Sequence, residues 1–170
     1  MENRVGKFEK VSLKQFRDDF VSCVGGTAAA AEKLFDNVKL PVRATAGSAG
    51  YDIICPFDLR LEPGEGVKIP TGLRIKMQQG WMLLVLPKSG LGFKYRLQLD
   101  NTMGLIESDY YGSDNEGHII VAVTNDSRTE KVLELPAGKA FVQAVLVPYG
   151  ITEDDSAEGI RRGGFGSTDA

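Results

Sequence analysis

The chain has 170 residues, of which 42% are hydrophobic and 25% are charged, a composition typical of a globular protein with one domain. The net charge of −3 argues against a nucleic-acid-binding protein, since such proteins usually carry a basic net charge. No C-x-x-C metal motif, no 18-residue apolar run and no signal peptide is readable, so we expect a cytoplasmic protein with no membrane partner.

The first 36 residues show helical periodicity. Ser12 is followed three residues later by a glutamine, which is the spacing of an N-terminal capping box. Apolar residues then recur at helical spacing until the glycine pair at 25–26. Residues 27–35 predict a second short helix, because Ala, Glu, Lys and Leu favour helices. We therefore expect residues 1–36 to form a helical extension packed on the main domain, with binding of a partner as the alternative.

From residue 37 onward the apolar period changes from that of a helix to that of a strand. Short alternating or apolar runs are separated by turns rich in proline and glycine. Because these runs do not alternate with helices, residues 37–150 predict an all-β sandwich or barrel and not a doubly wound α/β fold. The predicted strands are residues 67–69, 73–77, 81–86, 118–124 and 141–147.

Residues 151–170 are acidic, then basic, then rich in glycine, and nothing in them predicts a core. A disordered tail is one interpretation. Phe165, however, is an aromatic residue surrounded by glycines, which is more typical of an arm that closes over a ligand. We predict such an arm.

Two segments combine glycine with chemically active side chains. Asp52 follows the glycine and tyrosine of SAGYD, and it either supports a metal-bound water or holds a turn. Residues 87–92 (PKSGLG) bring Lys88, Ser89 and Gly90 together, so they form either a simple turn or an anion cradle of backbone N–H groups, hydroxyl and ammonium. The P-loop pattern is absent.

Residues 101–112 (NTMGLIESDYYG) carry two carboxylates beside an aromatic ring. Glu107 and Asp109 are two residues apart, so they share a face if the segment is extended. A carboxylate next to Tyr110 suits general-base attack by water on a bound nucleotide. The alternative is an acidic surface loop.

Two further polar features lie near the C-terminal end. Gln143 is the lone polar residue of an apolar strand, so its amide either satisfies the core or faces a ligand. Arg161 belongs to an arginine pair in front of the glycine-rich segment, where it either clamps a phosphate or is a solvated charge.

Taken in order, AGYD, PKSGLG, GLIESDYYG, GKAFVQ and RRGGFGSTD resemble the five ordered motifs of the trimeric dUTPase family, over residues 41–169. The resemblance implies a β-barrel-like jelly roll and a homotrimer with sites between subunits, each closed by the arm of a neighbouring subunit. It implies a hydrolase of nucleotide metabolism that cleaves dUTP to dUMP and pyrophosphate by water attack on the α-phosphate. This reaction limits uracil incorporation into DNA and supplies dUMP for dTTP synthesis.

The resemblance also implies roles for individual residues. Glu107 activates the attacking water, and Asp52 belongs to the metal-water network. Tyr110 packs on the deoxyribose and excludes a 2′-OH, and Asn101 reads uracil beside backbone groups of its hairpin. Mg²⁺ is expected on the triphosphate through substrate oxygens and water, with no direct protein ligand. The remaining substrate-binding positions are Lys88, Ser89, Gly90, Gly104, Gln143, Arg161, Phe165 (over uracil), Gly166, Ser167 and Thr168.

The chain departs from the family pattern at several positions. Glu107 stands where the family usually has Asp, and its side chain is one methylene longer, so we predict reduced but nonzero turnover. Lys88 replaces a usual Arg, which keeps the charge but loses the planar fork. Asp169 replaces a usual glycine, and residues 113–116 lengthen the turn after the tyrosines.

Other functions fit the sequence less well. A catalytically weakened dUTP-binding or regulatory protein is the main alternative, because of Glu107 and Lys88. A dCTP deaminase is less compatible, because Ala122 occupies the position where that family has a glutamate. The zinc deaminase signature is absent, and a Ser–His–Asp hydrolase would have to use His118 without a G-x-S-x-G motif.

Overall fold

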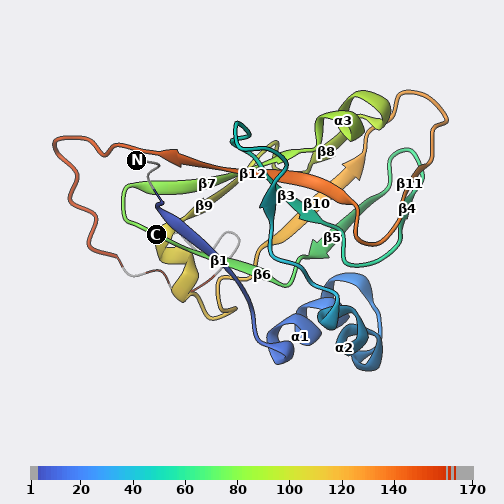
Figure 1. The fold of residues 1–170 in the computed structure, drawn as a ribbon, viewed down its shortest axis with the longest axis horizontal. Helices are drawn as coiled ribbons and strands as arrows, with labels where there is room; N and C mark the ends of the chain where they lie inside the picture. The colour runs from blue at the N-terminus through green and yellow to red at the C-terminus, as the bar shows by residue number, and fades with distance from the viewer. Residues whose placement is uncertain (1–3, 160, 162, 164–170) are drawn as a thin grey trace.

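The computed structural model describes residues 4–159, 161 and 163, and within these residues the chain consists mainly of antiparallel strands (Figure 1). The elements are β1 (Gly6–Lys10), α1 (Leu13–Val24), α2 (Ala28–Asp36), β2 (Val42–Arg43), β3 (Tyr51–Ile54), β4 (Leu59–Leu61), β5 (Gly66–Pro70), β6 (Leu73–Met77), β7 (Trp81–Pro87), α3 (Ser89–Tyr95), β8 (Leu97–Leu99), β9 (Gly104–Glu107), the 3-10 helix η1 (Ser108–Gly112), β10 (Ile120–Asn125), β11 (Leu133–Leu135) and β12 (Ala140–Pro148). The all-β prediction is confirmed.

The strands pair into one large sheet and three smaller ones. The large sheet has the order β2-β3-β12-β7-β9, and the three-stranded sheet has the order β5-β10-β8. The two remaining sheets are the pairs β1-β6 and β11-β4. The predicted strands 67–69, 73–77, 81–86 and 141–147 are confirmed as β5, β6, β7 and β12, whereas the strand predicted from residue 118 begins later, as β10.

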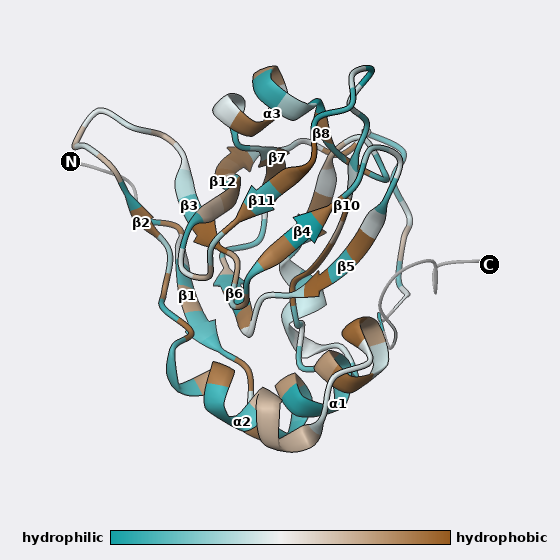
Figure 2. Cartoon of the chain, turned by 90° about the vertical axis from the view of Figure 1, so that its right-hand side faces the viewer, coloured by the Kyte–Doolittle hydropathy of each residue, from teal (hydrophilic) through white to brown (hydrophobic). Residues whose placement is uncertain are grey.

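Alternation of buried and exposed side chains explains how these strands enclose a core. Along β6, Leu73, Ile75 and Met77 are buried, while the basic side chains between them are more exposed. The same alternation of hydrophilic and hydrophobic residues is visible along β4 and β5 in Figure 2. In the large sheet, Val85 on β7 and Val142 on β12 are buried, so the middle of that sheet supplies part of the core.

The N-terminal segment is not purely helical, which corrects the prediction for residues 1–36. β1 pairs antiparallel with β6, placing Phe8 opposite Ile75. The sequence of β1, GKFEK, has a single apolar residue, so it offers no periodicity that distinguishes a strand. Pairing with β6 supplies the hydrogen bonds that make it a strand.

Both predicted helices are confirmed, and so is the predicted Ser12 cap of the first. The Ser12 hydroxyl accepts from the Gln15 amide at 3.1 Å, and Thr27 caps α2 through the Ala30 amide at 3.2 Å. The capping box is only half formed. The Gln15 side chain donates to Asp19, while the Ser12 amide donates to Glu116 at 2.7 Å.

The two helices belong to the main core. Phe16 and Phe20 of α1 are almost fully buried and lie in the same hydrophobic cluster as the strand residues. Phe16 also packs beside Phe35 of α2, with ring centroids 5.5 Å apart. The helices therefore cover one end of the sheets, and α3 lies at the opposite end (Figures 1 and 2).

Residues 87–92, predicted as a turn or an anion cradle, lead instead into the helix α3. Leu91 packs against the core and Tyr95 is buried, so tertiary packing outweighs the low helix propensity of the two glycines. Arg96 ends the helix in the left-handed region with φ of 52°.

Beyond β12, residues 151–159 form no helix or strand and are exposed. Among the described residues, no helix combines the length and the apolar character needed to cross a membrane. Phe165, Gly166, Ser167 and Thr168, the predicted arm residues, lie outside the described part of the chain.

Candidate active site

A cleft of about 340 Å³ opens between β9 and β10, beside the turn that joins β8 to β9. Its walls include buried apolar residues of β7 and β10, and its rim is polar. The predicted site residues that line it are Asn101, Gly104, Glu107, Tyr110 and Arg161.

The β8–β9 turn shapes one wall of the cleft. Thr102 adopts a φ of 70°, and the Met103 amide donates to the Asn101 carbonyl at 2.8 Å, so the turn is tight. At Gly104 an added Cβ would lie 3.0 Å from the Val85 Cβ. Glycine therefore allows β9 to pack closely on β7 beside the cleft.

Glu107 and Asp109 meet through one arginine. The Arg161 guanidinium lies 3.0 Å from Glu107 Oε2 and 3.1 Å from Asp109 Oδ1. The prediction that both carboxylates share a face of an extended segment is wrong in its geometry, because Asp109 lies in η1. The two carboxylates still face the same cation, and because one guanidinium neutralises only one of them, this corner of the cleft stays net negative.

Tyr110 is held in place by its hydroxyl group. The hydroxyl donates to the His118 carbonyl at 2.9 Å and accepts from Asn115 Nδ2 at 2.8 Å. Burial raises the pKa of Tyr110 above its usual value near 10, so the phenol remains a hydrogen-bond donor at neutral pH. The Arg161 guanidinium also lies 5.8 Å from the centre of the Tyr110 ring.

A second group of predicted site residues gathers on the large sheet. Lys88 Nζ lies 2.5 and 2.6 Å from the two carboxylate oxygens of Asp52. Asp52 and Gln143 are register partners on β3 and β12, so their side chains share a face of the sheet. Ser89 and Gly90 form the first turn of α3, directly after Lys88.

This second group is not part of the cleft formed by the same chain. None of Asp52, Lys88 and Gln143 lines the cleft. β3 is three strands away from β9, about 14 Å at ordinary strand spacing. Strand pairing places Asp52 level with Leu86 of β7, through β12, and Glu107 level with Met82. The two positions are therefore also offset by four residues along the strands, about 13 Å. Together these offsets separate the two positions by roughly 19 Å.

Three residues that the sequence did not single out for the site contact Tyr110 or support it: Asn115, His118 and Asp19. Asn115 belongs to the insertion 113–116, which we interpreted only as a longer loop. The position of that insertion, directly after the two tyrosines, was the available signal.

Residues 36–169 match the protein-family model of dUTPase. The deoxyuridine 5'-triphosphate nucleotidohydrolase of Lactococcus lactis is 40% identical over 136 residues, which are 78% of this chain and 89% of that protein. The enzyme of the same name from Burkholderia multivorans is 41% identical over 135 residues, 76% of this chain and 88% of that protein.

Solved structures agree with these matches. The dUTPase of Streptococcus mutans superposes with a TM-score of 0.61 at 36% identity, covering 69% of this chain and 91% of that one. A point mutant of the dUTPase from phage phi11 of S. aureus, described with a structural Mg(II) ion, has a TM-score of 0.63. It is 18% identical and covers 92% of this chain and 98% of that one, so it supports the fold alone.

Proposed function

The chain belongs to the dUTPase family and hydrolyses dUTP to dUMP and pyrophosphate, and we propose that the cleft between β9 and β10 is where it does so. One observation carries this placement. An asparagine in the β8–β9 turn, a carboxylate on β9 and a buried tyrosine in η1 line a single cleft, together with Arg161 from the far end of the chain.

We propose that Glu107 is the general base. Its side chain is 35% exposed at the wall of the cleft, so it can reach a water molecule beside a bound nucleotide. The carboxylate takes a proton from water while the water oxygen bonds to the α-phosphorus. The bond from that phosphorus to the bridging oxygen breaks, and pyrophosphate leaves. General-base assistance of this kind typically contributes about 10²–10⁴-fold.

Recognition of the nucleoside is assigned to the β8–β9 turn and to Tyr110. Asn101 and the backbone around Gly104 offer hydrogen-bonding groups to the uracil edge. Tyr110, whose hydroxyl is bonded to His118 and Asn115, is proposed to pack its ring on the sugar and thereby exclude a 2′-OH.

The triphosphate is assigned to the second group of residues. Lys88, Ser89, Gly90 and Gln143 supply an ammonium, a hydroxyl, backbone N–H groups and an amide. Mg²⁺ would be held mainly by phosphate oxygens and water near Asp52, because this ion usually keeps several waters and binds through substrate phosphates. There it would neutralise phosphate charge.

The separation of the two groups supports a site shared between subunits, as in the homotrimer that we propose. One chain places Asp52 and Glu107 roughly 19 Å apart, farther than a triphosphate extends from its sugar. A neighbouring subunit that contributes its own Lys88 group to this cleft would complete the site. Phe165, Gly166, Ser167 and Thr168 are proposed to close that site as part of the arm.

Arg161 is proposed to change partners when the substrate binds. In the structure it pairs with Glu107 and Asp109. A guanidinium binds phosphate oxygens with the same fork geometry, so a γ-phosphate can replace the carboxylates. The exchange would leave Glu107 free to accept a proton.

The assignment of Glu107 is tested with Glu107→Gln, assayed for pyrophosphate release from dUTP. We expect turnover to fall by about 10²-fold or more while dUTP binding remains. Glu134→Gln is the matched control, because Glu134 lies on β11 with a side chain 74% exposed and does not line the cleft. In ¹⁸O-water, the wild-type protein should label dUMP and not pyrophosphate. Full turnover in Glu107→Gln would exclude this residue as the base.

A further inference from the structure

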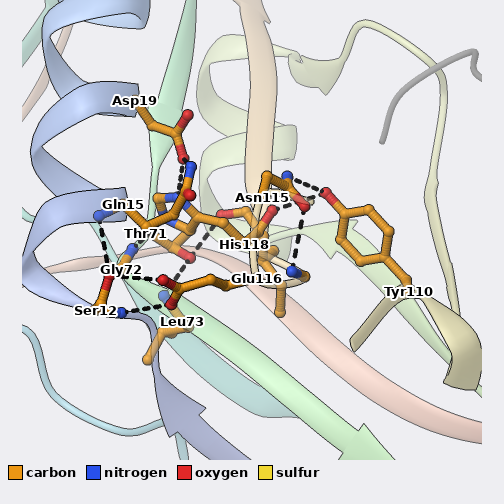
Figure 3. Close-up of polar contacts among 12 residues, drawn as sticks. Ser12, Gln15, Asp19, Thr71, Gly72, Leu73, Tyr110, Asn115, Glu116 and His118 are labelled. Atoms are coloured by element: carbon orange, nitrogen blue, oxygen red, sulfur yellow. Dashed lines mark hydrogen bonds and ion pairs between the residues drawn. The ribbon is translucent and has the colours of Figure 1, made fainter. Parts of the chain in front are cut away.

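The N-terminal segment contacts the loop that carries Tyr110 at several separate points, drawn in part in Figure 3. At the first, Glu116 accepts from both the amide and the hydroxyl of Ser12, each at 2.7 Å. Glu116 thus supplies the second half of the α1 cap, and the inserted turn is tied to the start of α1.

The second contact is buried. His118 is fully inaccessible, and its Nε2 accepts from the Gly72 amide at 2.8 Å. Nδ1 therefore carries the proton, which it donates to Asp19 of α1 at 2.5 Å. Asp19 also accepts from Gln15 at 2.9 Å, so α1 fixes both the tautomer and the orientation of the ring.

The same short turn holds the tyrosine hydroxyl. The carbonyl of His118 and the amide side chain of Asn115 are the two hydrogen-bond partners of Tyr110 described above. Asn115 is itself oriented by the Gly117 amide, which donates to its Oδ1 at 3.2 Å. A continuous chain of polar contacts therefore runs from α1, through residues 115–118, to the wall of the cleft (Figure 3).

A parallel set of contacts comes from β1. The Tyr111 hydroxyl donates to Glu9 at 2.7 Å, and this bond lowers the pKa of Glu9. Arg74 lies over the Tyr111 ring at 4.5 Å and pairs with Glu9 at 3.5 Å. The N-terminal segment therefore contacts Tyr111 directly and reaches Tyr110 through residues 115–118.

We propose that Asp19, Asn115, Glu116 and His118 are positioning residues for Tyr110, and that the N-terminal helices thereby set the preference of the enzyme for dUTP over UTP. The proposal rests on the proposed role of Tyr110 at the sugar. Exclusion of a single hydroxyl requires the ring to be held to within roughly 0.5 Å, and residues that lock a side chain through hydrogen bonds supply that precision.

Asp19→Asn and Asp18→Asn form a matched pair for the test. The two residues are neighbours on α1 and undergo the same chemical change. Asp18 is exposed and pairs only with Lys14 and Arg17 at the surface, among the contacts described, so its loss should have little effect. The measured quantity is the ratio of kcat/KM for dUTP to kcat/KM for UTP. We expect Asp19→Asn to lower it by roughly tenfold or more, and Asp18→Asn to leave it unchanged.

Asn115→Ala provides a second test in case Asp19→Asn folds poorly. Asn115 lies in a surface turn, so its replacement should disturb the fold less. It should lower the same ratio. Combining Asp19→Asn with Tyr110→Phe gives a double-mutant cycle. Tyr110→Phe removes the hydrogen bonds to His118 and Asn115, so Asp19→Asn should lower the ratio less in that background than in the wild-type background.

The outcomes separate this inference from the proposed function. Suppose that the wild-type protein prefers dUTP and that the folded variants Asp19→Asn and Asn115→Ala keep the full preference. The positioning role is then overturned, while the proposed function stands. Additive effects of Asp19→Asn and Tyr110→Phe on the dUTP/UTP ratio would also overturn the positioning role. If the wild-type protein neither binds nor hydrolyses dUTP, the proposed function fails and the inference fails with it.

Discussion

At the scale of single residues, the proposed base is one methylene longer than the aspartate that the family resemblance leads us to expect. Side-chain pKa values of Asp and Glu are close, about 3.9 and 4.3 in model peptides, so reach matters more than basicity. A displacement of ~1 Å can cost about 10²-fold in rate. We therefore expect Glu107→Asp to raise kcat for dUTP, measured by pyrophosphate release. Unchanged or lower turnover in Glu107→Asp would show that the local backbone already suits glutamate.

Gly117 has a backbone conformation and close contacts that constrain the tyrosine loop. It has a φ of 68°, and an added Cβ would lie 2.7 Å from both the Tyr110 carbonyl oxygen and the Tyr111 Cα. Gly117→Ala should therefore destabilise the fold by about 1–3 kcal/mol, measured by urea unfolding. Gly112→Ala is the control, because no atom lies within 4 Å of its added Cβ. Equal stability of the two variants would contradict the role given to Gly117.

The sequence identified the residues of the cleft better than it identified their supports. Asn101, Glu107 and Tyr110 lie in one continuous segment, so a local pattern was enough to find them. The support from His118 depends on Asp19, which is 99 residues away in the sequence. No local periodicity encodes such a contact, because it exists only after α1 has docked on the sheets.

At the scale of elements, a helix cap was predictable but its second partner was not. The spacing of Ser12 and Gln15 predicted α1, and the structure confirms it. The pairing of β1 with β6 and the helix α3 were missed, since β1 has one apolar residue and α3 contains two glycines. In both cases long-range packing, and not local propensity, determines the element.

The cap supplied by Glu116 gives a prediction for stability against pH. Burial opposes the charge of this carboxyl, but the hydrogen bonds from the Ser12 hydroxyl and amide outweigh it, and the pKa of Glu116 lies below its usual value near 4.5. A lowered folded-state pKa stabilises the native protein at pH above the unfolded value, and this stabilisation is lost as the pH falls through the folded value.

We therefore expect the difference in Tm between the wild-type protein and Glu116→Gln to be largest above about pH 5 and to shrink as the pH falls below 4.5. Comparing the two proteins at each pH cancels the titration of all other carboxyls. A Tm difference that does not change with pH would show that the charge of Glu116 does not stabilise the cap.

At the scale of the whole molecule, the separation of Lys88 from the cleft predicts complementation between inactive variants. In a shared site, Glu107 comes from one subunit and Gln143 from another. If Glu107→Gln and Gln143→Ala are unfolded and refolded together in equal amounts, the proposed homotrimer should have about a quarter of all its sites intact. Activity should exceed that of either variant alone. Activity no higher than the two separate variants would show that each chain builds its site by itself.

The most direct measurement is pyrophosphate release by the wild-type protein with Mg²⁺ and dUTP, with UTP, dCTP and dTTP in parallel reactions. The geometry of the cleft predicts release from dUTP alone, since Tyr110 and the hairpin around Asn101 are proposed to select the sugar and the base. Tight binding of dUTP without formation of dUMP or pyrophosphate would contradict the proposed mechanism, because Glu107 would then lie in the cleft without serving as a base.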